Sequence, residues 1–221
     1  MRQAALTATL RRAQVLGYIG TGDIGKYIHH AQAHLQAARP TPNSKWCDLG
    51  SGGGLPGLLV ALERPDLELT LIDRSVARAK FLENALREIG AAENVEVVTG
   101  DASEVAHNPL YRARYDGVFS RSFGPPSATV ECAVALLSRG GRLVVSEPPE
   151  PSEERWPSGP LGALGFEKLT VVEGPPRFVT MSLANFPESG VPRKWARICL
   201  LYTSDAADEG LGVDLGGRRI I

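Results

Sequence analysis

The stretch Trp46-Cys-Asp-Leu-Gly-Ser-Gly-Gly-Gly-Leu-Pro-Gly57 decides the fold class of this chain. A short apolar run ends at Leu49, four of the next six residues are glycine, and a helical pattern follows over residues 58–63. Glycines are needed in such a turn because a Cβ atom would block the tight backbone path and the approach of a ligand. The following helix offers unpaired N–H groups at its amino end. The stretch therefore predicts a strand, a glycine loop and a helix start that bind a nucleotide-like cofactor.

Strand and helix patterns alternate on both sides of this loop. Helical periodicity covers residues 3–16 and 23–37, and a helix that Ser75 opens is ended by Gly90. A further helix is expected over residues 126–137. The predicted strands before residue 147 are 45–49, 69–73, 95–98, 117–120 and 142–146. Strands that alternate with helices predict a mostly parallel sheet with helices on both faces.

The pattern changes after Ser146. A loop rich in proline and glutamate is predicted over residues 147–160. Three short strand candidates follow, at residues 168–172, 178–182 and 195–198. We expect these strands to pair antiparallel at the edge of the sheet.

Composition indicates an ordinary globular protein. The chain has 221 residues, of which 43% are hydrophobic and 22% are charged, and its net charge of −1 does not by itself indicate nucleic-acid binding. No apolar stretch approaches the roughly 20 residues that span a bilayer, and the amino terminus lacks a secretory signal pattern. Cys47, Cys132 and Cys199 lack the spacing of a zinc site or a disulfide framework. We expect a cytoplasmic protein.

The last residues differ in character from the rest. From Cys199 the chain reads Cys-Leu-Leu-Tyr-Thr-Ser-Asp-Ala-Ala-Asp-Glu, which resembles the translation of a sequencing adapter. We expect residues 199–221 to be non-native and assign no function to them.

The glycine loop fits two classes of cofactor. Gly50-x-Gly52-x-Gly54 is common in S-adenosylmethionine-dependent methyltransferases, whereas Gly52-x-Gly54-x-x-Gly57 matches the dinucleotide fingerprint. Both expect an acidic residue about 20 residues further on, at the end of the second strand, to bind ribose hydroxyls. Asp73 stands at that position. A cap on the following helix is the alternative role for its carboxylate.

Two features favour S-adenosylmethionine. Gly100-Asp101-Ala102-Ser103 follows the third strand, where methyltransferases of this class place a loop against adenine, although Asp101 also suits the N-cap of a helix over residues 102–106. No segment remains for a separate substrate domain, and the Tyr-x-x-x-Lys pair of short-chain dehydrogenases is missing. We predict a methyltransferase, with an NAD(P)-dependent oxidoreductase as the less favoured alternative.

Three segments resemble one family more specifically. They are Asp48–Gly57, Leu71-Ile-Asp-Arg74 and Tyr115–Phe123. Together they are similar to the bacterial 16S rRNA guanine-N7 methyltransferases, also called glucose-inhibited division protein B, over roughly residues 20–198. The resemblance implies a Rossmann-like class I methyltransferase fold, S-adenosylmethionine as cofactor and the small ribosomal subunit as partner. We expect a monomer. The order of the predicted elements, without a repeat or a low-complexity linker, indicates one methyltransferase domain at residues 43–198 with an amino-terminal helical extension at residues 1–42.

The same resemblance and the loop pattern assign site residues. The predicted cofactor contacts are Gly50, Gly52, Gly54, Leu55, Asp73, Ala102, Ser103 and Arg121. Among them Asp73 takes the ribose, Ala102 and Ser103 lie by the adenine, and Arg121 stands at the mouth of the site. The candidate RNA contacts are Arg121, Phe123, Arg193 and Lys194. A structural salt bridge for Arg121, a core or lid role for Phe123 and scattered surface charge for the basic residues are the alternatives.

Some segments depart from the family. Gly17-Tyr-Ile-Gly-Thr-Gly22 and Tyr27–His34 replace an Asn-Leu-Thr and a His-x-Leu-Asp-Ser segment, and Ser146-Glu-Pro-Pro149 replaces a lysine-glycine step. These departures predict a divergent branch. A small-molecule methyltransferase and a non-catalytic cofactor-binding protein therefore stay open as alternatives.

Guanine N7 offers an in-plane lone pair, so methyl transfer to it needs no general base, and we predict no catalytic acid or base. We interpret Glu147-Pro-Pro as a loop turn rather than as an amine-methyltransferase motif. His30 and His34 have the spacing of a metal-binding pair, with His29 beside them. Because a third ligand is not evident, we favour a solvated helix face and predict no metal site.

Overall fold

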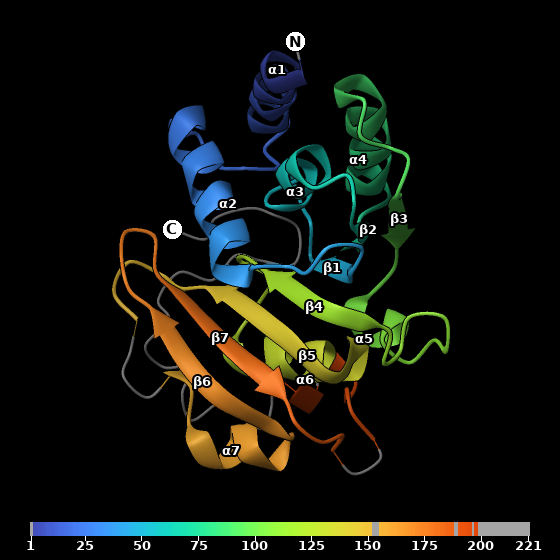
Figure 1. Cartoon of the computed structure of the whole chain (residues 1–221). Coiled ribbons are helices and arrows are strands. Elements are labelled where there is room, and N and C mark those ends of the chain that lie inside the picture. Colours follow the sequence, from blue (N-terminus) through green and yellow to red (C-terminus); the bar gives the residue numbers. More distant parts are fainter. Residues whose placement is uncertain (1, 152–154, 188–189, 196, 199–221) are drawn as a thin grey trace.

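The computed structural model describes residues 2–151, 155–187, 190–195 and 197–198. In that part of the chain a seven-stranded sheet lies between two layers of helices (Figure 1). The predicted adapter-like tail at residues 199–221 lies outside the described residues.

The sheet is mostly parallel, as predicted. Its strands lie in the order β3-β2-β1-β4-β5-β7-β6, with β1 to β5 parallel and β7 antiparallel to both β5 and β6. Strand order reverses between β1 and β4, the kind of switch point beside which ligands of open α/β sheets bind. The strands are β1 (Lys45–Leu49), β2 (Glu68–Asp73), β3 (Val95–Thr99), β4 (Tyr115–Ser120), β5 (Leu137–Ser146), β6 (Phe166–Val172) and β7 (Phe178–Leu183).

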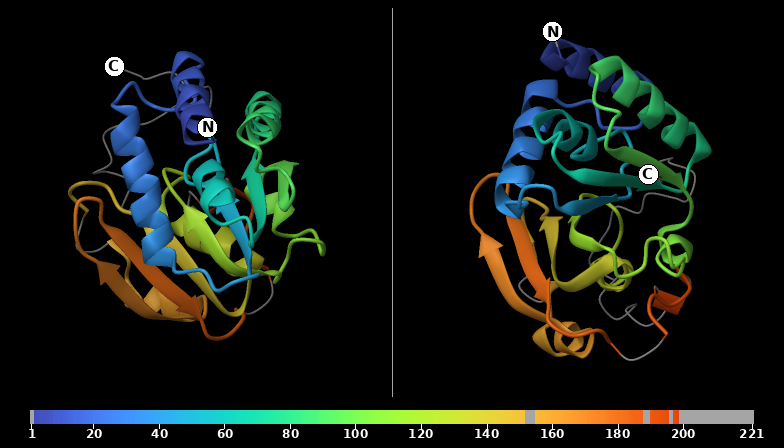
Figure 2. Two further views of the ribbon diagram at one scale, coloured as in Figure 1. Left: turned by 45° about the horizontal axis from the view of Figure 1, so that its top comes forward. Right: turned by 45° about the vertical axis from the view of Figure 1, so that its right-hand side comes forward.

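Seven helices of the described chain cover the two faces. They are α1 (Arg2–Val15), α2 (Ile24–Ala38), α3 (Gly57–Glu63), α4 (Val76–Ile89), α5 (Ala102–Val105), α6 (Pro126–Leu136) and α7 (Ser158–Ala163). Helices α1 to α4 gather on one side of the sheet (Figures 1 and 2), and α5 to α7 lie on the other. Each side has its own buried apolar cluster, because successive residues of a strand point to opposite faces.

Helix α4 illustrates how local sequence sets the element boundaries. The Ser75 hydroxyl accepts a hydrogen bond from the Arg78 backbone N–H at the helix start. Gly90 ends the helix in a left-handed conformation with φ 66°, which costs glycine little because it has no Cβ atom. Both predicted boundaries are confirmed.

Two predictions near the carboxyl end of the described chain are wrong. Residues 195, 197 and 198 are helical rather than extended, and the Lys194 carbonyl accepts hydrogen bonds from the N–H groups of Arg197 and Ile198. Packing of Trp195 against Phe123 overrides the strand propensity of the aromatic and branched side chains there. The predicted loop 147–160 also ends early, because α7 begins at Ser158. Pro160 is tolerated there because the first turn of a helix has no need of its N–H.

Candidate active site

The glycine loop joins β1 to α3 at the carboxyl edge of the sheet. Gly50, Gly52 and Gly54 have φ angles of 75°, 53° and 102°, a region that residues with a side chain rarely adopt. The N–H groups of Gly50 and Ser51 donate to the Ile72 carbonyl at 3.0 and 2.9 Å, which ties the loop to β2. The backbone conformation of the loop therefore confirms the prediction that these three positions need glycine.

Neighbouring segments press closely on this loop. A Cβ atom on Gly50 would lie 2.6 Å from Phe123 Cδ2, and one on Gly53 would lie 2.5 Å from Ile19 Cγ2. Phe123 in turn meets the Trp195 ring edge to face at 5.4 Å. The predicted RNA contact Phe123 thus packs between the first glycine of the loop and Trp195. Leu55, at the other end of the loop, is buried.

Asp73 fastens the loop to the start of α4. Its side chain is almost fully buried, Oδ2 accepts from the Gly52 N–H at 2.8 Å, and Oδ1 accepts from the Ser75 N–H at 2.8 Å. Ser75 is the N-cap residue of α4, so the alternative role of Asp73 as the cap of this helix is wrong. Asp73 only contacts the capping residue. A carboxylate has about four acceptor positions, so two backbone bonds leave capacity for ribose hydroxyls.

The predicted adenine loop lies beside Asp73. The Gly100 N–H donates to the Asp73 carbonyl at 3.1 Å. Asp101 caps α5 by accepting from the Ser103 N–H at 2.9 Å, so its alternative role as N-cap is confirmed. Ala102 and Ser103 are both largely buried at the start of that helix. The fold therefore brings these residues together with the glycine loop, and their contact with adenine stays a prediction.

Arg121 follows β4 and turns toward the helices of the α1–α4 layer. Its guanidinium carbon lies 5.3 Å from the centre of the Tyr27 ring on α2. Desolvation lowers the pKa of Arg121, while Tyr27 and Asp48 act in the opposite direction. Among the described residues its guanidinium makes no ion pair and no hydrogen bond, so the alternative of a structural salt bridge finds no partner. A partly buried cation of this kind is well placed to bind an anionic or carbonyl group of a ligand.

Asp48 is a site residue that the sequence reasoning missed. It is 1% exposed, and its Oδ2 accepts a hydrogen bond from the Gly57 N–H at 2.9 Å. Burial raises the pKa of this carboxyl to about 7, against the effects of the Gly57 hydrogen bond and of Arg121. The available signal was an acidic residue between the apolar Cys47 and Leu49, directly before the glycine loop.

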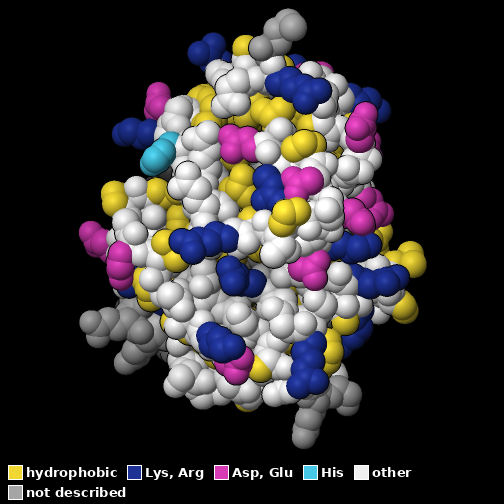
Figure 3. All heavy atoms as spheres, in the orientation of Figure 1, with side chains coloured by type: hydrophobic (Ala, Val, Ile, Leu, Met, Phe, Trp, Pro, Cys, Tyr) yellow, Lys and Arg dark blue, Asp and Glu magenta, His cyan; other side chains and the backbone are white. Residues whose placement is uncertain are grey.

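The basic RNA candidates are placed differently from one another. The Arg193 guanidinium binds the Glu131 carboxylate, which is 1% exposed, and the Arg193 backbone N–H donates to the same carboxylate at 3.0 Å. Lys194 is exposed. Lysine and arginine side chains are interspersed with acidic ones on the face seen in Figure 3. The structure thus gives Arg193 a carboxylate partner, and leaves Lys194 as the exposed candidate of the pair.

The expectation of a solvated histidine face on α2 is wrong for two of the three residues. His34 is fully buried, with Nε2 3.0 Å from the Val144 carbonyl, and His30 is partly buried, with Nε2 2.9 Å from Ser146 Oγ. Desolvation lowers the pKa of His30 to about 4 and that of His34 to about 3, so both are neutral at physiological pH. Within the described chain, no group of three or more His, Cys, Asp or Glu could hold a metal ion.

Glu147 directly follows β5, at the start of an irregular segment. Its carboxylate is largely buried and accepts from the Trp156 indole N–H at 3.1 Å. Its backbone N–H donates to the Arg177 carbonyl at 3.0 Å. These contacts engage Glu147 within the protein rather than at an acceptor site.

Comparison with known proteins decides the family. The family model GidB, described as rRNA small subunit methyltransferase G, matches residues 18–154. The chain belongs to this family. All three segments that carried the sequence resemblance lie inside the matched region.

Individual relatives agree with the GidB assignment. The ribosomal RNA small subunit methyltransferase G of Lactobacillus delbrueckii subsp. bulgaricus is 37% identical over 111 residues, which are 50% of this chain and 46% of that protein. The protein of the same name from Symbiobacterium thermophilum is 32% identical over 133 residues, 58% of this chain and 54% of that protein. The chain thus spans about half the length of the curated relatives it matches.

The fold is shared with solved methyltransferase structures. A SAM-dependent O-methyltransferase from Thermotoga maritima superposes with a TM-score of 0.58, covering 80% of this chain and 72% of that protein at 16% identity. At this identity the likeness concerns the fold alone. It agrees with the predicted Rossmann-like class I architecture.

Two segments for which the sequence predicted a departure from the GidB family pattern lie against the site. Ile19, from the 17–22 turn, contacts the glycine loop at Gly53, and Tyr27 lies beneath Arg121. Both segments therefore lie beside residues that are predicted to bind ligands rather than on a remote surface. In the part of the chain that the structure describes, no helix is both long and apolar enough to cross a membrane.

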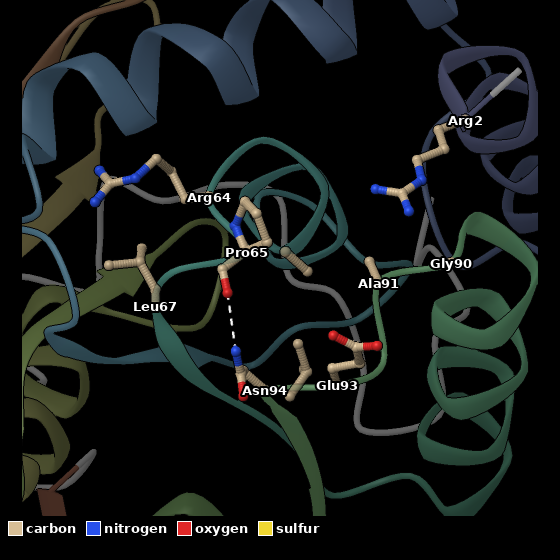
Figure 4. A pocket seen from close by; sticks show the side chains of 10 residues that line it. Arg2, Arg64, Pro65, Leu67, Gly90, Ala91, Glu93 and Asn94 are labelled. Atoms are coloured by element: carbon tan, nitrogen blue, oxygen red, sulfur yellow. Dashed lines mark hydrogen bonds between the residues drawn. The ribbon is translucent and has the colours of Figure 1, made fainter.

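A small pocket lies at the opposite edge of the sheet from the glycine loop (Figure 4). It has a volume of ≈ 90 Å³ and is bordered by Arg2, Arg64 and Glu93, while the Asn94 side chain donates to the Pro65 carbonyl at 2.9 Å. Since β3 begins at Val95, this is the amino edge of the strands. Its size and its place both separate it from the cofactor site.

Proposed function

We propose that this protein transfers the methyl group of S-adenosylmethionine to N7 of a guanine in 16S rRNA of the small ribosomal subunit. The observation that carries the proposal is the GidB family match over residues 18–154, which contains the glycine loop, Asp73 and Arg121. The small-subunit rRNA is taken from the description of that family, and guanine N7 from the sequence resemblance, because the fold by itself serves many acceptors.

The residues at the carboxyl edge fit S-adenosylmethionine. The loop glycines make room that a Cβ atom would fill, Asp73 retains acceptor positions for ribose hydroxyls, and Arg121 has donors for the methionine carboxylate. The full set of residues proposed to hold the cofactor is Gly50, Gly52, Gly54, Leu55, Asp73, Ala102, Ser103 and Arg121.

The chemistry asks for alignment rather than proton transfer. The cofactor supplies a methyl group on a positively charged sulfur. The residues of the chain then have two tasks, to hold the donor at the glycine loop and to present the guanine edge at the ends of β4 and β5. Guanine N7 reacts through its lone pair, so a catalytic base is not part of the proposal.

Partner, location and domain division belong to the same proposal. We infer a cytoplasmic monomer that acts on the small ribosomal subunit, with Arg121, Phe123 and Lys194 as RNA contacts. Residues 1–42 form the amino-terminal extension, 43–198 the methyltransferase domain, and 199–221 a non-native tail. Helix α2 of that extension packs on β5 and β7, which supports a structural role for it.

The test uses 30S particles from a bacterial strain that lacks the endogenous N7 modification. Methyl transfer is scored by N7-specific strand cleavage, and cofactor binding is measured separately by calorimetry. We expect site-specific cleavage that depends on added enzyme and cofactor. Tight cofactor binding without any transfer to 30S particles or free 16S rRNA would reject the RNA acceptor and favour a small-molecule methyltransferase or a non-catalytic binding protein.

A variant checks the cofactor site. Gly52→Val places a β-branched residue at a φ of 53°, which strains the loop and its hydrogen bond to Asp73. We expect loss of S-adenosylmethionine binding in calorimetry with a retained circular dichroism spectrum. Unchanged binding would reject the glycine loop as the cofactor cradle.

A further inference from the structure

Helix α2 docks on β5 through three polar contacts that recur in step. His30 Nε2 lies 2.9 Å from Ser146 Oγ, His34 Nε2 lies 3.0 Å from the Val144 carbonyl, and Arg142 donates to the Ala38 carbonyl at 3.2 Å. Four helical residues rise about 6 Å and two strand residues about 6.6 Å, so the two repeats match. The position of His30 is therefore set by the docking of a whole helix.

This docking places the His30–Ser146 pair at the proposed acceptor side. Ser146 is the last residue of β5, and the preceding Val145 pairs with Ser120, the last residue of β4. Ser146 thus lies level with Arg121, on the face of the sheet that α2 covers. Ser146 is only partly buried. It stands where the carboxyl ends of neighbouring parallel strands receive ligands.

The surroundings of His30 determine which of its nitrogens carries the proton. The imidazole is neutral, because burial and the nearby Arg121 charge lower its pKa. Its Nδ1 is buried and has no hydrogen-bond partner among the described residues. We assign the proton to Nε2, because buried N–H groups without an acceptor are rarer in proteins than buried acceptors without a donor. His30 then donates to Ser146 Oγ, which leaves the serine proton available for a ligand.

We propose that the Ser146 hydroxyl donates a hydrogen bond to the carbonyl oxygen O6 of the acceptor guanine, and that His30 is the positioning residue that orients it. The inference rests on the proposed function. O6 is adjacent to N7 on the same edge of guanine, so a base with N7 turned to the methyl donor brings O6 to the same mouth. Adenine carries an amino group at that place, which cannot accept. The pair therefore selects guanine over adenine.

The test compares variants on RNA fragments in which the acceptor base is changed. Inosine keeps O6 and N7, whereas 2-aminopurine keeps N7 and lacks O6. For the wild-type protein we expect kcat/KM to fall about 10- to 100-fold on 2-aminopurine and to change little on inosine. Ser146→Ala should lose a similar factor on guanine, and it should no longer distinguish guanine from 2-aminopurine.

His30 is tested by removal and by partial restoration. His30→Ala should lower kcat/KM on guanine about tenfold, and His30→Gln should recover part of that loss because its amide nitrogen can donate to Ser146. His29→Gln is the matched control, because this neighbour on the same helix is exposed. Cofactor affinity should stay within about twofold in all these variants.

Two results would overturn this inference and leave the proposed function intact. One is a Ser146→Ala protein that methylates guanine as well as wild type and still discriminates against 2-aminopurine. The other is a loss of cofactor affinity in Ser146→Ala, which would assign the hydroxyl to the cofactor instead. Failure of the wild-type protein to methylate any rRNA, despite cofactor binding, would remove the proposed function and this inference together.

Discussion

The buried carboxylate of Asp48 accepts a hydrogen bond from the backbone N–H of Gly57 at 2.9 Å. This bond joins the end of β1 to the first residue of α3 and spans the glycine loop between them. The loop is thus held from three sides, by Asp48 across its ends, by Asp73 from β2 and by Phe123 from the segment after β4. Each of these contacts leads to a measurable expectation.

Gly57→Ala should destabilise the protein by about 1–3 kcal/mol, because overpacking in a tight interior costs that much. The added Cβ would lie 2.4 Å from Leu71 Cδ2 and 2.6 Å from Asp48 Oδ2. Gly162→Ala is the matched control on α7, where a Cβ meets nothing within 4 Å. That control should be neutral or slightly stabilising. Equal urea midpoints for the two variants would contradict the close contact at Gly57.

Asp48 should make stability fall as pH rises toward neutral. Its pKa is raised from 3.8 to about 7 in the folded protein, so between these values the folded state binds more protons than the unfolded state. Its contribution is complete below about pH 4 and is lost as pH rises through about 7. Asp48→Asn removes this dependence. In urea unfolding from pH 5 to 8, the free energy of unfolding of the variant relative to wild type should rise by up to about 1.4 kcal/mol per pH unit. A constant difference would contradict the raised pKa.

His34 should give stability a pH dependence of the opposite sign, so that stability falls as pH falls. Its pKa is lowered from 6.5 to about 3, so the unfolded state binds the extra proton between these values. Stability from this residue is complete above about pH 6.5 and is lost as pH falls. His34→Gln keeps a donor for the Val144 carbonyl and lacks a titrating ring. As pH falls below 6, the free energy of unfolding should decrease less for the variant than for wild type in urea unfolding. An equal decrease for both proteins would contradict the lowered pKa of His34.

Asp73→Ala should weaken S-adenosylmethionine binding at least about tenfold in calorimetry, because the variant loses both the loop contact and the ribose acceptor. The matched control is Asp116→Ala. Asp116 also accepts a backbone N–H, from Lys45 at 2.8 Å, but at the amino edge of the sheet. Equal affinity losses in the two variants would point to general destabilisation rather than to a ribose contact.

Arg193 and Lys194 should separate stability from RNA binding. Arg193→Ala leaves the buried Glu131 carboxylate without its guanidinium, which should cost about 3 kcal/mol in unfolding experiments. Lys194→Ala should leave stability unchanged and reduce the salt dependence of RNA binding by about one phosphate contact. A stable Arg193→Ala protein with weakened RNA binding would reverse this assignment.

Local sequence predicted those features that depend on neighbouring residues. The limits of β1, the capping of α4 by Ser75 and Gly90, and the positive φ angles of the glycine loop follow from residue type and spacing. Asp73 and the segment 100–103 lie together because the carboxyl ends of parallel strands meet at one edge, and their contacts with the cofactor stay predictions. The family resemblance added Arg121, whose place over Tyr27 no local pattern indicates.

Sequence alone thus determined the glycine loop, the parallel sheet and the family, because these are recorded in short-range spacing and in turn chemistry. Only the tertiary structure decided which polar residues lie inside. His34 and Asp48 are buried, and Glu131 binds Arg193, through contacts between segments that are distant along the chain. Burial and charge pairing depend on those distant partners, so periodicity within α2 could not distinguish a solvated histidine face from one that docks on β5.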